Sequence, residues 1–183
     1  MKLSQQSTTK VLNPVRAIQF IDEVYHVDEK GKRQGKCEKH DWFEVENETE
    51  GSKIGKQNPN VWSIGDPNRG RPAFAYVSER GTYKDDEKDG LWIQLGRDGS
   101  IIGITSYQSG ERRGICMEHR YGEDHFYRID EHGDECSVTQ KEIEAVKKQA
   151  QEMIQDTSYH STWVSKVDTK TSLLGRSRNI LEH

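Results

Sequence analysis

The sequence is poor in apolar residues, cysteine and proline. Hydrophobic residues occupy 31% of the 183 positions and charged residues 32%, with only 3 cysteines and 4 prolines. An average globular chain is richer in apolar residues. This composition predicts wide solvent exposure, as in a thin sheet or a repeat array, because the apolar residues that exist cluster in short runs.

Long hydrophobic segments are also missing. No apolar run approaches the roughly 20 residues that a membrane helix needs, and residues 1–14 lack the apolar stretch of a signal peptide. An odd, sparse set of cysteines without a signal peptide is typical of reduced thiols. We therefore expect a cytoplasmic protein with no membrane partner.

The charge balance disfavours a dedicated nucleic-acid binder. The formal net charge is −4 and both signs are mixed along the chain, whereas nucleic-acid binders usually carry a basic excess or stripe. Another protein is the expected partner, and the composition leaves the oligomeric state open.

Turn signals punctuate residues 90–136 every 9 to 12 residues. Asp98-Gly99 is among the strongest hairpin signals, because glycine accepts positive φ without steric cost. Short apolar runs lie between the turns, as in Leu91–Leu95 and Ile101–Ile104. The rhythm predicts an antiparallel meander of glycine-punctuated hairpins, and therefore a mainly β member of the α+β class.

One amphipathic helix is expected at about 140–155. Thr139 and Glu142 form a capping-box pattern, and Val146, Ala150 and Met153 share a face at helical spacing. That face is expected to pack on the sheet.

The rest of the chain divides around this domain. We expect a polar tail over residues 1–14, a β-rich domain over 15–157 and a polar segment over 158–180, with 181–183 resembling the start of an affinity tag. Residues 15–27 fit a strand or a helix, and the turn signal at Lys30-Gly31 favours the strand. Residues 47–72 read as a long loop with a short extra strand at Trp62.

The chain also repeats itself. Residues 31–40 and 110–119 are identical at 5 of 10 positions, and residues 83–90 match 107–114 at an offset of 24. The pattern Tyr107-x-x-Gly110-x-x-x-Gly114, with Gly90-Leu91-Trp92 and Asp98-Gly99 before it, resembles MORN-type repeats. The likeness is closest to the variant of bacterial antitoxin-like proteins. It implies a scaffold of β-hairpins that binds other molecules and carries no catalytic residues.

The repeat places two Cys-x-x-His pairs in the chain, Cys37 with His40 and Cys116 with His119. Two thiols and two imidazoles suit a tetrahedral structural zinc. However, residues i and i+3 of a strand point to opposite faces, so the pairs chelate only on a turn. Packing residues copied by duplication are the alternative interpretation.

Arginine and aromatic residues supply the candidate binding surface. Such residues are enriched among the energetic anchors of protein interfaces. The candidates are Trp62, Arg69, Arg71, Tyr107, Arg112, Arg113, Arg120 and Tyr121. The sequence thus predicts a non-enzymatic protein-binding scaffold, of the antitoxin-like, immunity or phage-inhibitor type, acting through a sheet face and the long loop. The alternative is a small zinc-stabilised or metal-dependent enzyme or nucleic-acid-processing module that uses the Cys-x-x-His pairs.

Overall fold

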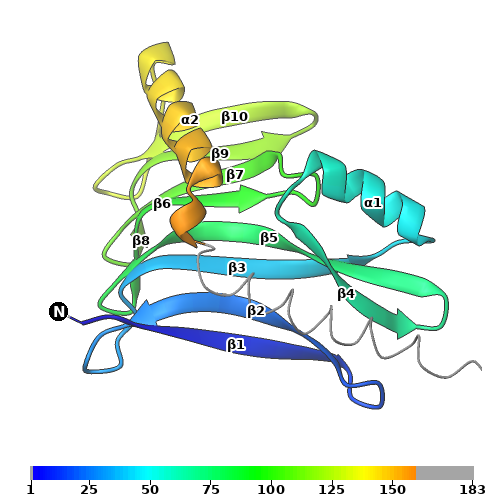
Figure 1. Cartoon of the computed structure of the whole chain (residues 1–183). Helices are drawn as coiled ribbons and strands as arrows, with labels where there is room; N and C mark the ends of the chain where they lie inside the picture. The colour runs from blue at the N-terminus through cyan, green and yellow to red at the C-terminus, as the bar shows by residue number, and fades with distance from the viewer. Residues whose placement is uncertain (1, 160–183) are drawn as a thin grey trace, which may run out of the picture.

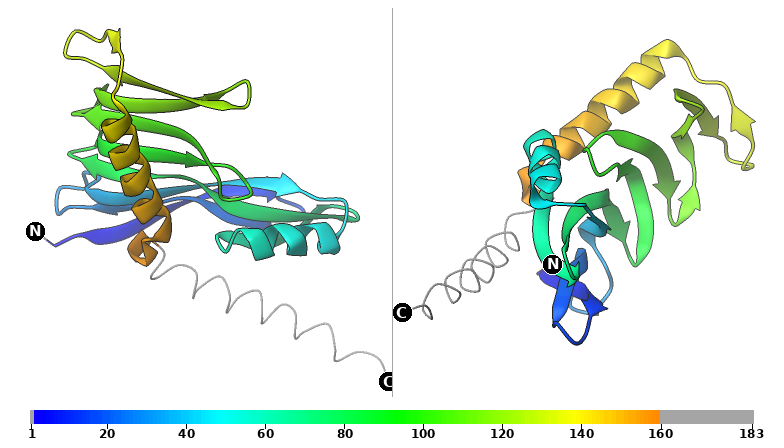
Figure 2. Two further views of the ribbon diagram at one scale, coloured as in Figure 1. Left: turned by 90° about the horizontal axis from the view of Figure 1, so that it is seen from above. Right: turned by 90° about the vertical axis from the view of Figure 1, so that its right-hand side faces the viewer.

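A large antiparallel sheet forms the body of the computed structural model, which describes residues 2–159 (Figure 1). Its 11 strands follow the order β1-β2-β3-β5-β6-β7-β9-β10-β11, with β4 paired to β5 and β8 paired to β7 beside this path. The sheet is twisted and curled, as its edge-on views show (Figure 2). The predicted fold class, a mainly β meander with a C-terminal helix, is confirmed.

The elements have the following bounds. The strands are β1 (Ser4–Asn13), β2 (Ile18–Val27), β3 (Gly35–Glu44), β4 (Val61–Asn68), β5 (Arg71–Lys84), β6 (Glu87–Leu95), β7 (Ile101–Gln108), β8 (Glu111–Arg112), β9 (Gly114–Arg120), β10 (Glu123–Ile129) and β11 (Glu135–Cys136). The helices are α1 (Glu48–Gln57) and α2 (Gln140–Gln155), followed by the 3₁₀ turn η1 (Thr157–Tyr159). No described helix is long and apolar enough to cross a membrane.

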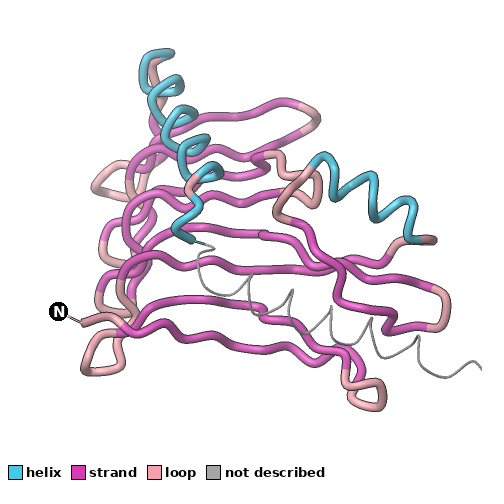
Figure 3. The backbone as a smooth tube through the Cα atoms, viewed as in Figure 1, coloured by secondary structure: helices cyan, strands magenta, loops and turns pink. Residues whose placement is uncertain are grey.

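Tight turns at the ends of the strands set the register of three hairpins (Figure 3). Each turn consists of two residues with positive φ, which matches the right-handed twist of the flanking strands. The pairs are Asp85-Asp86, Ser109-Gly110 and Tyr121-Gly122.

The helix α2 begins at its predicted cap and lies across the strands on one face of the sheet (Figure 1). The Thr139 side chain accepts from the Glu142 amide, and the Glu142 carboxylate accepts from the Thr139 amide at 2.9 Å. Val146 and Ala150 then pack with the apolar side chains of β5, β6, β7 and β9. This layer is the main core of the protein.

A buried arginine holds the other end of α2. The Arg80 side chain on β5 is fully buried, and its Nη1 donates to the carbonyls of Met153 and Ile154, both at 2.7 Å. Carbonyls in the last turn of a helix have no intrahelical donor and attract positive charge. Glu38 neutralises the guanidinium through a 2.8 Å bond to Nε, and its other carboxylate oxygen contacts the His40 ring.

Two segments differ from the sequence-based expectations. Residues 1–14 were predicted to be a tail, but Ser4–Asn13 forms β1, which pairs along its length with β2. Residues 47–72 were predicted to be a long loop, but they hold α1 and β4. Asn47 caps α1 by accepting from the Glu50 amide at 3.0 Å, and Gly51 packs against the ring of Phe74.

The structure also bears on the expectations for residues 15–27, for Trp62 and for the C-terminal segment. The strand over residues 15–27 is confirmed as β2, after a turn at residues 14–17, and the extra strand at Trp62 is confirmed as β4. The predicted polar segment 158–180 and the tag-like residues 181–183 lie outside the described residues, apart from residues 158–159.

Candidate functional site

The face of the sheet opposite α2 carries aromatic and charged side chains instead of an apolar layer. Because side chains alternate along a strand, Trp92 points away from α2 while its neighbours Leu91 and Ile93 pack toward the helix. Strand register aligns Trp92 with Thr105. We call the outward side of β3, β5, β6, β7, β9 and β10 the open face. The helix α2 packs on the other side, and α1 packs against β4 and β5.

A row of tyrosines crosses the open face, and each tyrosine lies under a cation from the preceding hairpin. The Arg33 guanidinium lies 4.0 Å from the centroid of the Tyr83 ring. The Lys88 ammonium lies 5.1 Å from that of Tyr107, and the Arg112 guanidinium lies 6.0 Å from that of Tyr127. We call these six residues, with Trp92, the cation–aromatic ladder. The tyrosines occupy β5, β7 and β10, each two strands apart, so the repeat is about 10 Å.

Trp92 is the centre of the ladder and is almost fully buried, although neither of the described helices covers it. Gly81 lies beneath the indole, where a Cβ atom would come within 2.1 Å of the ring. The Lys88 ammonium lies 4.0 Å from the ring centroid on the exposed side, and Lys39 lies at 5.6 Å. Glu79 holds both lysines at 3.1 Å. A glycine seat and a bridged pair of lysines therefore fix the indole in place.

The far end of the ladder is a hydrogen-bonded triangle. Arg112 Nη2 donates to the Tyr127 hydroxyl at 2.5 Å, and that hydroxyl donates to Glu118 at 2.6 Å. Burial, with Glu118 as acceptor, raises the pKa of Tyr127 to about 12. The Tyr127 hydroxyl, with help from Arg120, lowers the pKa of Glu118. The triangle is therefore a fixed arrangement with charge on Glu118 and Arg112 over the neutral pH range.

A shallow depression of about 410 Å³ lies beside the triangle. Gly103 forms part of its lining, and a side chain there would collide with Gln94, whose Oε1 lies 2.5 Å from an ideal Cβ. Thr105 and Glu118 also line it. The lining of the depression includes an amide, a hydroxyl and a carboxylate.

The predicted binding residues fall in several places. Tyr107 and Arg112 belong to the ladder, whereas Trp62 packs into the core with its ring edge against His40 at 5.0 Å. Arg113 donates to the carbonyl of Asp130 and to Glu111, and Arg120 pairs with Glu118. Tyr121 is fully exposed at the β9–β10 turn. Arg69 and Arg71 lie at the β4–β5 turn. The structure thus brings together three of the eight residues on the open face, namely Tyr107, Arg112 and Arg120.

The other ladder residues were not predicted from the sequence, although the spacing of Lys88 and Trp92 indicated them. Tyr83, Lys88 and Trp92 have the same spacing as Tyr107, Arg112 and Cys116. In both copies the cation comes two residues before a glycine and the buried residue two residues after it. An alignment by cation and buried residue would have selected Lys88 and Trp92.

The two Cys-x-x-His pairs do not meet. Cys37 is buried on the open face, whereas His40 faces the core, where its Nδ1 lies 2.7 Å from the Ile21 carbonyl. Cys116 lies on β9, and β5, β6 and β7 separate it from Cys37 on β3. Within residues 2–159 no group of three or more His, Cys, Asp or Glu side chains is arranged to hold a metal ion.

His119, the last member of the two pairs, is exposed on β9. Its Nδ1 lies 2.9 Å from Asp124, so the imidazole belongs to a surface pair with the neighbouring strand. It does not approach Cys37 or His40, because the three intervening strands hold β9 away from β3.

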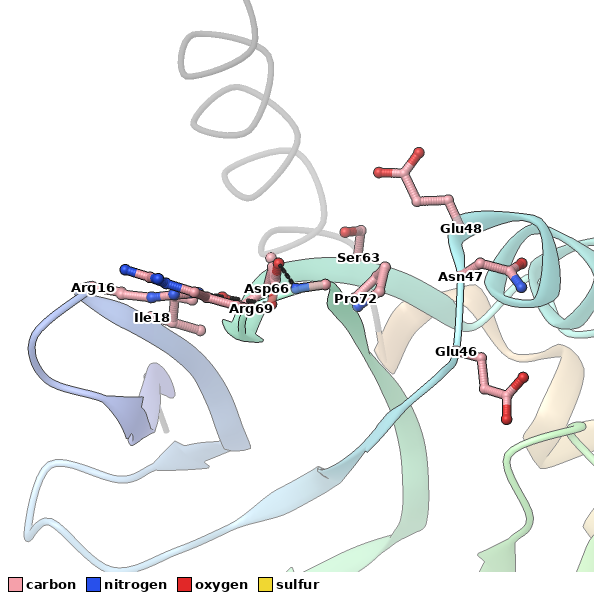
Figure 4. A pocket seen from close by; sticks show the side chains of 11 residues that line it. Arg16, Ile18, Glu46, Asn47, Glu48, Ser63, Asp66, Arg69 and Pro72 are labelled. Carbon is pink, nitrogen blue, oxygen red and sulfur yellow. Dashed lines mark hydrogen bonds and ion pairs between the residues drawn. The ribbon is translucent and has the colours of Figure 1, made fainter.

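A wider pocket, of about 1010 Å³, lies away from the ladder, between the β1–β2 turn, the β4–β5 turn and the start of α1. Figure 4 shows Arg16, Asp66 and Arg69 at one side and Glu46 and Glu48 at the other. Arg16 donates to the Asp66 carbonyl at 2.8 Å, so one of its two cations is already bound within the protein. The pocket is broad and of mixed charge, and it selects no ligand class.

Comparison with known proteins gives no relative. No family model, no curated protein and no solved structure matches the chain. The resemblance to MORN-type repeats therefore stays a prediction.

Proposed function

We propose that this chain is a non-enzymatic scaffold that binds another protein through the open face of its sheet, as an inhibitor, immunity or antitoxin-like protein would. The observation that carries the proposal is the cation–aromatic ladder. Trp, Tyr and Arg are the residues most enriched among the energetic anchors of protein interfaces. Here the rings of Tyr83, Trp92 and Tyr127 are themselves almost fully buried, and they support a row of cations on a face that the described helices leave uncovered.

Pre-organisation of the ladder supports a binding role. Trp92 is locked by Gly81, and its Nε1 donates to the Thr82 carbonyl at 3.0 Å. The Tyr127 hydroxyl is fixed between two charged partners. Side chains that are already ordered lose little conformational entropy on association, so more of the contact energy remains as affinity.

The charge pattern of the open face favours a protein over nucleic acid. Glu79 forms ion pairs with both Lys39 and Lys88, and Glu118 lies 3.8 Å from Arg112. Nucleic-acid affinity depends on cations that are available to phosphates, whereas these cations already have carboxylate partners. The net charge of −4 acts in the same direction.

The properties of Cys37, which lies on this face, favour a packing role over a role as nucleophile or zinc ligand. Burial and the nearby Glu23 raise the pKa of Cys37 far above its usual range. The side chain is therefore a neutral thiol, while a nucleophile or a zinc ligand has to be a thiolate. Cys37 contributes buried volume beneath the ladder, where it packs with Tyr83 and Trp92.

The test compares one variant on the open face with one on α2. Thr105 is half-buried beside Trp92, so Thr105→Arg adds bulk and charge to the ladder without removing a contact on which the fold depends. Gln149→Arg adds the same side chain to the exposed side of α2. A partner captured from a lysate of the encoding organism is identified, purified and titrated by calorimetry against the wild type and both variants.

We expect Thr105→Arg to weaken binding by about 100-fold, the size of a hot-spot loss of nearly 3 kcal/mol, and Gln149→Arg to leave it unchanged. Equal affinities for all three proteins, or a loss confined to Gln149→Arg, would show that the open face is not the binding surface. Circular dichroism of both variants checks that the fold is retained.

A further inference from the structure

Within residues 2–159, no strand pairs with the outer edge of β1. The sheet order begins at β1, which pairs only with β2 among the described residues. The strand is 10 residues long, and its burial pattern is exposed from Ser4 to Val11. An edge strand presents a row of backbone N–H and C=O groups that can pair with another strand.

This edge lacks the usual protection against such pairing. Natural edge strands are blocked by charges, prolines, bulges or short length, yet Ser4–Thr9 contains no charged residue, proline or glycine. The bulge near Thr8 inserts Asp22, which belongs to β2. Because a bulge bends the strand that carries the extra residue, β1 itself stays regular as far as Val11.

The opposite edge of the sheet shows the contrast. The two-residue strand β11 covers only Arg128 and Ile129 of β10. The uncovered part of β10 begins with Glu123, Asp124 and His125, two carboxylates and an imidazole. That edge begins with charges that oppose edge-to-edge pairing, whereas β1 carries no charge before Lys10.

Exposed apolar side chains also gather at β1. The structure exposes five large hydrophobic residues among those described, and three of them belong to this region: Leu3 just before β1, Val11 on it and Val15 in the turn after it. Leu3 and Val11 stand near the two ends of the strand.

We propose that a second copy of this chain pairs with β1, antiparallel about a two-fold axis, to form a continuous sheet. If the axis passes between Gln6 and Ser7, each Gln6 faces the Ser7 of the other copy. In the same register Leu3 faces Lys10 and Lys2 faces Val11, so the two lysines never oppose each other. Their aliphatic stems then cover the exposed apolar side chains.

The chemistry of β1 supports a copy of itself as the occupant. Directly opposed like charges destabilise an antiparallel pair, and Ser or Thr pairs stabilise it. The uncharged stretch Ser4–Thr9 meets the first requirement in any register close to the one described. A two-fold interface is self-complementary and closed, so the association stops at a dimer. The inference does not depend on the proposed function, since the open face remains free in both copies.

The test uses paired charge variants at the two central positions. Gln6→Lys/Ser7→Lys places like charges opposite each other in the homodimer, and so does Gln6→Glu/Ser7→Glu. Mixed one to one, the two variants place Lys opposite Glu. The open-face variant Thr105→Lys is the control, and circular dichroism checks the fold of every variant. Sedimentation equilibrium in low salt measures the mass over a wide range of protein concentration.

We expect the wild type and Thr105→Lys to move from 21.1 kDa toward twice that mass as the concentration rises. Each charge variant alone stays monomeric, the mixture regains the dimer, and added salt weakens the mixed dimer. A wild type that stays monomeric throughout overturns the proposal, and so does a mixture that stays monomeric. A dimer that Thr105→Lys abolishes places the interface on the open face and also overturns it.

Discussion

Two glycines in α1 give opposite predictions for the same substitution. Gly51 and Gly55 lie one helical turn apart. An ideal Cβ at Gly51 would come within 2.1 Å of two atoms of the Phe74 ring, whereas at Gly55 it would have no neighbour within 4 Å. The Phe74 ring is stacked on Phe43 at 6.0 Å, so it has little room to move.

The magnitudes follow from separating two effects. Replacing glycine by alanine inside a helix stabilises it by about 0.5–1 kcal/mol, because glycine loses more backbone entropy on folding. Gly55→Ala receives that gain alone. Gly51→Ala receives the same gain but overpacks the Phe74 contact, at a cost of about 1–3 kcal/mol. The difference between the variants therefore isolates the overpacking, and we expect Gly55→Ala to be the more stable by about 1–3 kcal/mol.

Urea unfolding followed by tryptophan fluorescence measures both variants against the wild type. The midpoint should rise for Gly55→Ala and fall for Gly51→Ala, with unchanged slopes. If both variants rise equally, α1 does not pack on β5 through Gly51, and the reasoning that replaces the predicted loop with a docked helix is wrong.

Two further predictions concern the ladder and the buried arginine. Burial raises the pKa of both Tyr83 and Tyr127 to about 12, so folding stability is retained below pH 10 and lost as the pH rises toward 12. Absorbance at 295 nm should show both tyrosines titrating late, near pH 12, and Tyr83→Phe should remove one of these late transitions. Arg80→Met should destabilise the fold by about 3–5 kcal/mol in urea unfolding, because the buried Glu38 carboxylate loses its guanidinium partner. The control Arg120→Met, at the surface, should have little effect. Equal losses of stability in the two variants would contradict the role of Arg80 under α2.

The elements that the sequence predicted well are those whose signals are local. The capping box at Thr139 and the Asp98-Gly99 turn each depend on residues a few positions apart, and both appear as expected. The missed elements depend on partners far along the chain. α1 carries two glycines and little apolar surface, and it acquires its packing from Phe74 on β5. β1 has no apolar alternation of its own, and β2 supplies its hydrogen-bond partner.

The candidate site shows the same limit. Tyr107 and Arg112 were selected from the sequence because they are near each other along the chain. The ladder, however, pairs Arg33 with Tyr83 and Lys88 with Tyr107, each across neighbouring hairpins. Such a contact depends on strand order. The sequence indicates strand order only through its turn signals, and not all of these turns were recognised.

The repeat itself explains why cysteine recurs. Gly35, Gly90 and Gly114 all have positive φ, between 72° and 91°, and each stands near the start of a returning strand. Two residues later comes a side chain that is almost fully buried on the open face, namely Cys37, Trp92 and Cys116. A position that accepts the indole of tryptophan as well as a thiol is selected for buried volume beneath the ladder, whatever its chemistry. The buried position of both cysteines therefore follows from the shared hairpin geometry. The cation–aromatic ladder above these buried side chains distinguishes the hairpins from repeats that serve structure alone.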